Sequence, residues 1–99
     1  FNEWKNIDLV KLLCHQMDVK LCREEGSSEK LITFVKDRKA HDKRYAIDSS
    51  KIRANIGWKP IENFETGLRK TVKWYIDNEK WWRNILIKNY SLSRIGIIK

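Results

Sequence analysis

The residues best suited to chemistry lie in one short stretch, from Lys36 to Arg44. It combines a histidine and two aspartates with five cations: His41, Asp37, Asp42, Lys36, Arg38, Lys39, Lys43 and Arg44. Burying so much unpaired charge would be too costly, so the stretch must lie at the surface. The planar guanidinium of Arg38 suits a bidentate contact with phosphate, which indicates an anion-binding loop. A solvated, salt-bridged surface loop accounts for the same charges equally well.

Complete catalytic motifs are absent from the sequence. The four glycines are too scattered to cradle a pyrophosphate, and there is no Tyr-x-x-x-Lys pair. His15 and His41 are expected on different elements, without the spacing of a metal site. Asp37 and Asp42 are expected to orient neighbouring cations or to cap the turn. The sequence therefore predicts a binding segment, with no catalytic residue and no metal ligand.

A strand before this stretch and a short helix after it are expected to hold it in place. Leu31–Val35 is β-branched and aromatic, which is typical of a strand buried on both faces. Tyr45–Ile47 is expected to be extended. Asp48 is a suitable N-cap for a short helix, and Gly57 suits the left-handed position that ends a helix.

Two longer amphipathic helices are expected outside that unit. The first is expected to start with Asn6 as its N-cap and to end near Asp18, and Val19–Cys22 is predicted to be a short strand. The second is expected to start after Asn63, which caps it. Its aromatic residues are expected to pack within the domain rather than to stack on nucleic-acid bases: Trp74, Trp81 and Trp82.

Length and composition indicate one folded domain. The chain has 99 residues, 41% of them hydrophobic, with five tryptophans, a net charge of +8 and a pI near 9.7. No apolar run approaches the roughly 20 residues that span a bilayer. The chain begins at Phe1 without Met, which suggests a piece of a longer protein. Cys14 and Cys22 are expected to be reduced, as in a cytosolic protein, with a disulfide between them as the less favoured alternative.

The run from Ile32 to Tyr75 resembles a known family. It reads Ile-Thr-Phe-Val-Lys-Asp-Arg-Lys-Ala-His-Asp-Lys-Arg-Tyr-Ala-Ile-Asp, then Gly-Trp-Lys-Pro, then Thr-Gly-Leu-Arg-Lys-Thr-Val-Lys-Trp-Tyr. In order and spacing it is similar to the C-terminal part of the dTDP-glucose 4,6-dehydratases, a family of extended short-chain dehydrogenases/reductases. The resemblance covers roughly residues 3–84.

The resemblance implies an α/β enzyme of which this chain is one part. Residues 1–84 would form the small, mainly helical C-terminal lobe with a few short strands, which binds the nucleotide sugar. Residues 85–99 would be a tail, packed or partly disordered. The Rossmann domain, its NAD and the catalytic residues would lie outside this chain. The implied parent is a cytoplasmic, NAD-dependent lyase acting on dTDP-glucose, a homodimer through the missing domain, and the isolated chain would be inactive.

The family's loop Asp-Arg-Pro-Gly-His-Asp-x-Arg-Tyr contacts the nucleotide diphosphate. The resemblance therefore implies that Arg38 binds phosphate and that His41 and Asp42 line the nucleotide pocket. Lys39 and Ala40 stand where the family has Pro and Gly, so the turn loses a fixed φ and a permissive residue. Lys39 adds a cation that is compatible with a diphosphate.

Two alternatives stay open. The chain could belong to another extended-family nucleotide-sugar dehydratase or an epimerase. In a different class, a charge of +8 and many aromatic residues also suit a small nucleic-acid-binding module. No nucleic-acid-binding motif is present, and the cations are spread along the whole chain. The first interpretation predicts no nucleic-acid partner and no membrane association.

Overall fold

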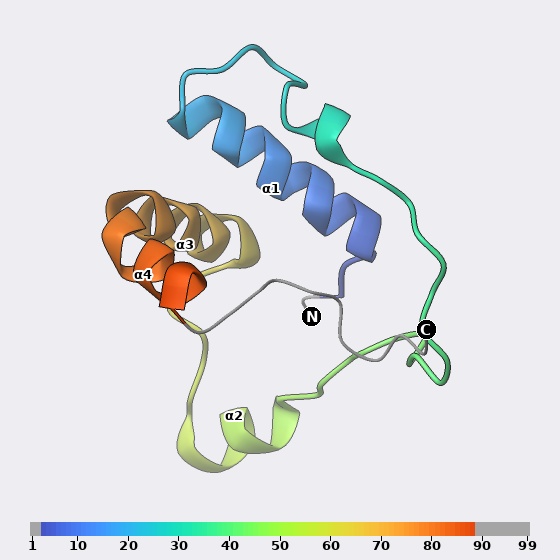
Figure 1. The fold of residues 1–99 in the computed structure, drawn as a ribbon. Helices are drawn as coiled ribbons and strands as arrows, with labels where there is room; N and C mark the ends of the chain where they lie inside the picture. Colours follow the sequence, from blue (N-terminus) through green and yellow to red (C-terminus); the bar gives the residue numbers. More distant parts are fainter. Residues whose placement is uncertain (1–2, 89–99) are drawn as a thin grey trace.

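The computed structural model describes residues 3–88, and four α-helices make up the regular structure of this part (Figure 1). Their bounds are Asn6–Lys20 (α1), Ser50–Ile56 (α2), Phe64–Asp77 (α3) and Glu79–Lys88 (α4), with a short 3-10 helix at Glu29–Leu31 (η1). The helix α3 packs against α1 and α4, and η1 lies against α1. The helix α2 stands apart at the end of a long connection and contacts no other described element (Figure 1).

The predicted first helix is confirmed, with shifted ends. Asn6 is its first residue rather than its cap, and the helix continues to Lys20, two residues past the predicted end. The strand predicted at Val19–Cys22 is wrong, because Val19 and Lys20 complete α1 and the next two residues form a turn. Just before α1, Trp4 stacks on Phe64 at the start of α3, with ring centroids 4.4 Å apart.

The turn after α1 is fixed by a buried hydrogen-bonded pair. The carboxylate of Asp18 accepts hydrogen bonds from the backbone N–H of Ser28 at 3.1 Å and from its hydroxyl at 2.5 Å. Both residues are buried, with 3% and 7% of their surfaces exposed. The pair holds the predicted loop, which begins at Arg23, against the end of α1. The helix η1 begins at the next residue, Glu29.

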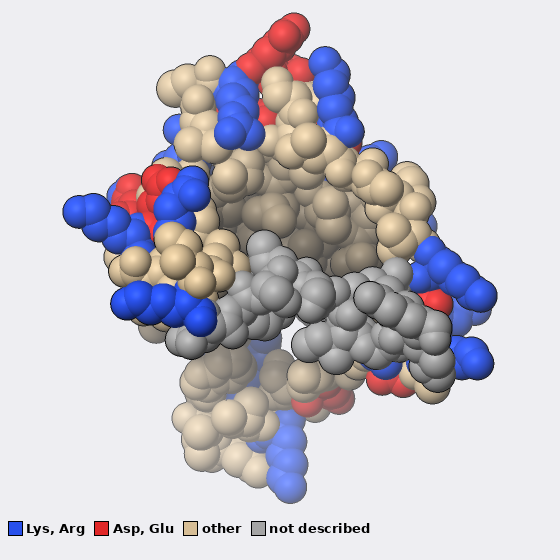
Figure 2. Space-filling view, viewed as in Figure 1, with Lys and Arg blue, Asp and Glu red and all other residues tan. Residues whose placement is uncertain are grey.

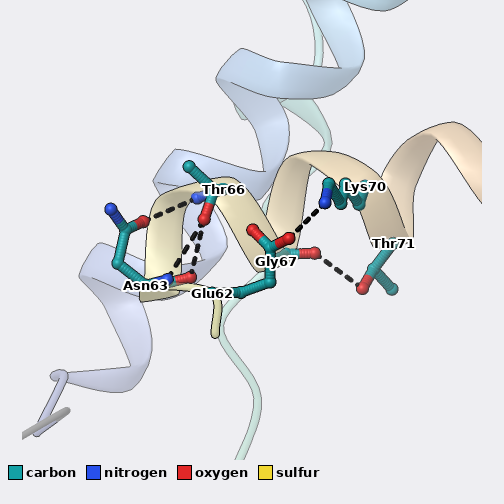
Figure 3. Close-up of polar contacts among 6 residues, drawn as sticks. All are labelled: Glu62, Asn63, Thr66, Gly67, Lys70 and Thr71. Carbon is teal, nitrogen blue, oxygen red and sulfur yellow. Dashed lines mark hydrogen bonds and ion pairs between the residues drawn. The ribbon is translucent and has the colours of Figure 1, made fainter. Parts of the chain in front are cut away.

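The start of α3 is capped as predicted. The side chain of Asn63 accepts from the backbone N–H of Thr66 at 2.8 Å, and the Thr66 hydroxyl accepts from the backbone N–H of Asn63 at 3.1 Å (Figure 3). This reciprocal pair is a capping box. Glu62 also forms an ion pair with Lys70, eight residues further along the chain. Along α3, Val72 is the one buried apolar residue among residues 3–88, with 3% of its surface exposed.

Tryptophan side chains make contacts between α3 and α4. The sequence predicted that they would pack within the domain, and two of them do so only in part. The indole N–H of Trp82 donates to the backbone oxygen of Tyr75 at 2.7 Å. Trp74 and Trp81 meet edge to face, with ring centroids 5.4 Å apart, yet about half of each stays exposed. The boundary predicted after residue 84 falls inside α4, and residues 89–99 of the predicted tail lie outside the described residues.

The short strands of the predicted α/β lobe are not found in residues 3–88, which form a helical fragment. Leu31 ends η1, and the following residues are extended without a neighbouring strand. Phe34 is 84% exposed, so the predicted burial is also wrong here. The physical reason is that a strand needs a partner for its backbone N–H and C=O groups, and no described segment supplies one.

Candidate functional site

The predicted binding residues lie on the long connection between η1 and α2. All four are exposed: Arg38, Lys39, His41 and Asp42. The connection leaves the three packed helices and reaches α2 without regular structure (Figure 1). The predicted helix after the loop is confirmed as α2, and Gly57 ends it with φ at +67°, as expected. Its cap is Ser49 rather than Asp48.

One carboxylate organises the turn inside this loop. Oδ1 of Asp37 accepts from the backbone N–H of Arg38 at 2.8 Å and contacts Nδ1 of His41 at 2.6 Å. Asp37 therefore caps the turn, as the sequence predicted. The contact with His41 also orients the imidazole, so that Nε2 is the ring nitrogen left for a ligand.

The electrostatics of the turn favour an ionised Asp37. The hydrogen bond from His41 is the largest cause that lowers the pKa of this carboxyl below its ordinary value, and the Arg38 backbone N–H adds to it. At the end of the loop, the backbone N–H of Ser50 donates to Asp48 at 2.9 Å and lowers the pKa of that carboxyl. Two ionised carboxylates thus fix the two ends of the loop.

The turn keeps a left-handed residue although it has no glycine. It is centred on Lys39 and Ala40, and Ala40 has φ at +57°. A type II turn has a positive φ at its third residue, usually glycine, and favours proline just before it. Ala40 adopts the left-handed conformation with a Cβ, which costs roughly 1–2 kcal/mol.

The structure brings together only part of the predicted set. Arg38 and His41 meet at Asp37, whereas Lys39 and Asp42 make no hydrogen bond or ion pair within residues 3–88. The guanidinium of Arg38 likewise has no hydrogen-bond partner in the described part of the chain. The loop therefore presents an imidazole that Asp37 orients and an exposed guanidinium three residues earlier in the sequence, and both kinds of group can bind an anion such as phosphate.

Neither a metal nor NAD fits the described residues. No group of three potential metal ligands occurs among residues 3–88. NAD binding would need a glycine-rich turn at a helix start, but the described glycines lie singly, with Gly26 in the turn before η1, Gly57 at the end of α2 and Gly67 inside α3. A hollow of about 190 Å³ lies beside α1. Its lining includes basic and acidic side chains: Lys11, His15, Asp18, Glu25 and Glu29. The carboxylate of Asp18 already accepts a hydrogen bond from Ser28.

The face of the molecule drawn in Figure 2 shows no single cationic patch. Lys and Arg side chains lie around the rim of the face in Figure 2, separated by other residues. None of the helices within residues 3–88 has the length and apolar character needed to cross a membrane. Cys14 and Cys22 are free thiols, and burial raises the pKa of Cys14.

Comparison with known proteins matches the resemblance found in the sequence. The sequence model of the GDP-mannose 4,6 dehydratase family matches residues 1–71. A dTDP-glucose 4,6-dehydratase of Neisseria meningitidis is 50% identical over 99 residues, which cover 96% of this chain and 28% of the relative. One of Escherichia coli is 45% identical over 99% of this chain and 28% of the relative. A probable dTDP-glucose 4,6-dehydratase of Sinorhizobium fredii is 48% identical, with the same coverage.

The chain thus spans little more than a quarter of the length of these relatives. The family match covers more than half of the chain and includes α1, the loop, α2 and most of α3. On this evidence the chain belongs to the GDP-mannose 4,6 dehydratase family.

Proposed function

We propose that this chain is the substrate-binding, C-terminal part of an NAD-dependent dTDP-glucose 4,6-dehydratase, a cytoplasmic lyase. The supporting observation is the 50% identity to a protein of that name over 96% of the chain. Because the described residues do not fit NAD, the cofactor and the catalytic groups belong to the part of the parent that this chain does not span. The parent would be a homodimer through that part.

Within the lobe, the loop around Arg38 is proposed to hold the nucleotide diphosphate. Arg38 supplies a bidentate, charge-assisted contact, and His41 supplies Nε2, which donates to a phosphate oxygen when the ring is protonated. Asp37 orients the imidazole of His41 and accepts a hydrogen bond from the backbone N–H of Arg38, so both residues belong to one turn. Lys39 adds positive charge, and Asp42 lines the same pocket.

This loop cannot bind tightly by itself. A hydrogen bond to a charged group contributes about 1.5–3 kcal/mol, so two contribute about 3–6 kcal/mol. Association costs at least about 4 kcal/mol. The difference corresponds to millimolar affinity or weaker, so the isolated chain should bind dTDP very weakly and should show no dehydratase activity.

The test is a chimera in which this chain replaces the matching segment of the Neisseria meningitidis relative. Arg38→Ala should raise KM for dTDP-glucose at least about tenfold and change kcat much less, since the lost contact serves binding. Lys51→Ala is the matched control, because it removes an exposed cation from α2. Equal KM values for the two variants would refute the role of the loop.

A sugar linked to GDP is the second candidate substrate, since the matching family is described by GDP-mannose. The same chimera distinguishes the two by competition with dTDP, GDP and UDP. Inhibition by dTDP at the lowest concentration supports the proposal, and inhibition by GDP at the lowest concentration supports the second candidate.

Nucleic-acid binding is the candidate of a different class, favoured only by the charge of +8. A gel shift with random DNA at about 50 and 200 mM salt tests it. Tight binding with a steep salt dependence would support this candidate and count against the first.

A further inference from the structure

His41 makes a contact that decides which of its ring nitrogens carries a hydrogen. Its Nδ1 lies 2.6 Å from Oδ1 of Asp37, four residues earlier in the chain. An ionised carboxylate only accepts hydrogen bonds, so Nδ1 is the donor at this distance. The hydrogen of the neutral imidazole therefore stays on Nδ1, and Nε2 is left with a lone pair.

Asp37 is ionised in this contact. Its Oδ1 also accepts from the backbone N–H of Arg38 at 2.8 Å. The hydrogen bond from His41 is the largest cause that lowers the pKa of Asp37, and the Arg38 N–H lowers this pKa further. Histidines change their charge between about pH 5 and 8, well above the range in which Asp37 titrates. The carboxylate therefore stays an acceptor while the imidazole gains or loses a proton.

The surroundings of His41 leave Asp37 as its partner. Asp37 is the one carboxylate that pairs with His41 within residues 3–88. The elements that pack together in this part of the chain are α1, η1, α3 and α4, and the loop lies outside them (Figure 1). The other charged groups near His41 in the sequence belong to the same loop: Arg38, Lys39, Asp42 and Lys43. The His41 side chain is 41% exposed, so a ligand can reach the ring.

This arrangement restricts the form of His41 that can bind phosphate. A phosphate oxygen is an acceptor and needs a donor. Neutral His41 would present the lone pair of Nε2 to it, and two lone pairs repel. The imidazolium carries a hydrogen on both nitrogens, so it can donate from Nε2 while Nδ1 stays bonded to Asp37. Contact between His41 and a phosphate therefore requires that the ring first takes up a proton.

We propose that Asp37 is a positioning residue that couples diphosphate binding to the uptake of one proton by His41. The proton comes from solvent and binds Nε2, and no covalent bond to the ligand forms. The coupling rests on the proposed function of the loop and adds a regulation to it. The parent protein should bind its nucleotide sugar more tightly in mild acid than in mild alkali, and Asp37 sets this dependence through His41.

The tautomer of His41 tests the first half of the proposal without any ligand. Nitrogen NMR of the imidazole in the 99-residue chain distinguishes the two neutral tautomers. At about pH 8 the hydrogen should lie on Nδ1. In Asp37→Ala both tautomers should be populated, because the acceptor is gone. Asp8→Ala, which removes an exposed carboxylate from α1, should leave the tautomer unchanged. A hydrogen on Nε2 in the unaltered chain would overturn the proposal.

The pH dependence of KM tests the second half, in the chimera with the Neisseria meningitidis relative. KM for dTDP-glucose should rise at least about fivefold from about pH 6 to about pH 8, because the charge-assisted hydrogen bond of the imidazolium is lost. His41→Gln should remove most of this rise, since an amide donates at every pH. Asp37→Ala should reduce the rise to less than about twofold, because the neutral ring can then donate from Nε2.

The control for this measurement is Asp8→Ala, which should keep the full rise of KM. Other titrating groups of the chimera are common to all variants, so the readout is the difference in slope between them. A merely structural role of Asp37 would raise KM by the same factor at every pH. That result would overturn the proposal, and so would a full rise in His41→Gln.

The outcomes also separate the proton coupling from the function of the loop. Equal KM values for Arg38→Ala and Lys51→Ala refute the phosphate contact itself at any pH. A raised KM for Arg38→Ala, together with a rise that persists in full in Asp37→Ala, would leave the proposed function standing and overturn the coupling alone.

Discussion

Asp18 and Ser28 form the most buried polar contact in the described part of the chain, although they are ten residues apart. The carboxylate lies near the C-terminal end of α1, where the helix dipole disfavours a negative charge. The N–H and hydroxyl of Ser28 compensate for this by donating to the same carboxylate. The contact makes the turn after α1 part of the folded unit and sets where η1 begins.

Asp18→Ala should therefore destabilise the chain by about 2–3 kcal/mol, because it leaves the two buried donors of Ser28 unsatisfied. Urea unfolding followed by circular dichroism measures the effect. Asp8→Ala, at an exposed position of the same helix, should change the free energy of unfolding by less than about 0.5 kcal/mol. Similar losses for the two variants would show that the buried pair contributes nothing specific.

Local signals in the sequence predicted the helices better than the rest of the fold. Asn63 caps the start of α3 and Gly57 ends α2, and each bonds only residues close to it in the sequence. Both helix boundaries could therefore be predicted. The partner of Asp18 could not, because the hydrogen bond depends on how the intervening turn folds back. Leu31–Val35 has the composition of a strand, yet a strand forms only when another segment pairs with it.

The candidate site was predictable in its residues and exposure but not in its geometry. Charge alone placed Arg38 and His41 at the surface. The contact between His41 and Asp37 spans Ala40, which has a left-handed conformation, and alanine gives no signal for that conformation.

Asn63→Ala should destabilise the chain by about 1 kcal/mol, because it removes one half of the capping box at the start of α3. Thr66→Val should have a similar effect by removing the other half. Their double variant should lose about the sum of the two single losses, because each variant removes a separate hydrogen bond between one side chain and the other residue's backbone N–H. A loss in urea unfolding from only one of the two single variants would contradict the reciprocal contact seen in Figure 3.

Gly67→Ala and Gly57→Ala should change stability in opposite directions. A Cβ at Gly67 would meet the Cβ of Glu62 at 3.7 Å, an ordinary contact, so alanine should stabilise α3 by about 0.5–1 kcal/mol. A Cβ at Gly57 also has space, but its φ of +67° makes alanine cost about 1 kcal/mol or more. Thermal unfolding of both variants measures the signs, and a shared sign would contradict the backbone argument.

The Asp37–His41 contact should weaken in acid. The pKa of Asp37 is lowered in the folded chain, first by the hydrogen bond from His41 and then by the Arg38 N–H. A lowered pKa means that the contact is fully present above the ordinary carboxyl pKa of about 3.9. It is then lost as the pH falls through the lowered value, when the carboxylate becomes protonated. A carboxyl titration by NMR should accordingly place the midpoint of Asp37 below that ordinary value.

His41→Ala separates this contact from the general effect of neighbouring cations. Without the imidazole, the midpoint of Asp37 should rise toward its ordinary value, because the largest cause of the lowering is gone. The backbone bond from Arg38 stays and should keep part of the shift. Lys51→Ala, which removes a cation outside the turn, should leave the midpoint where it was. A midpoint unaffected by His41→Ala would mean that the imidazole does not hold Asp37 in solution, and the fixed position of Nε2 would then lose its support.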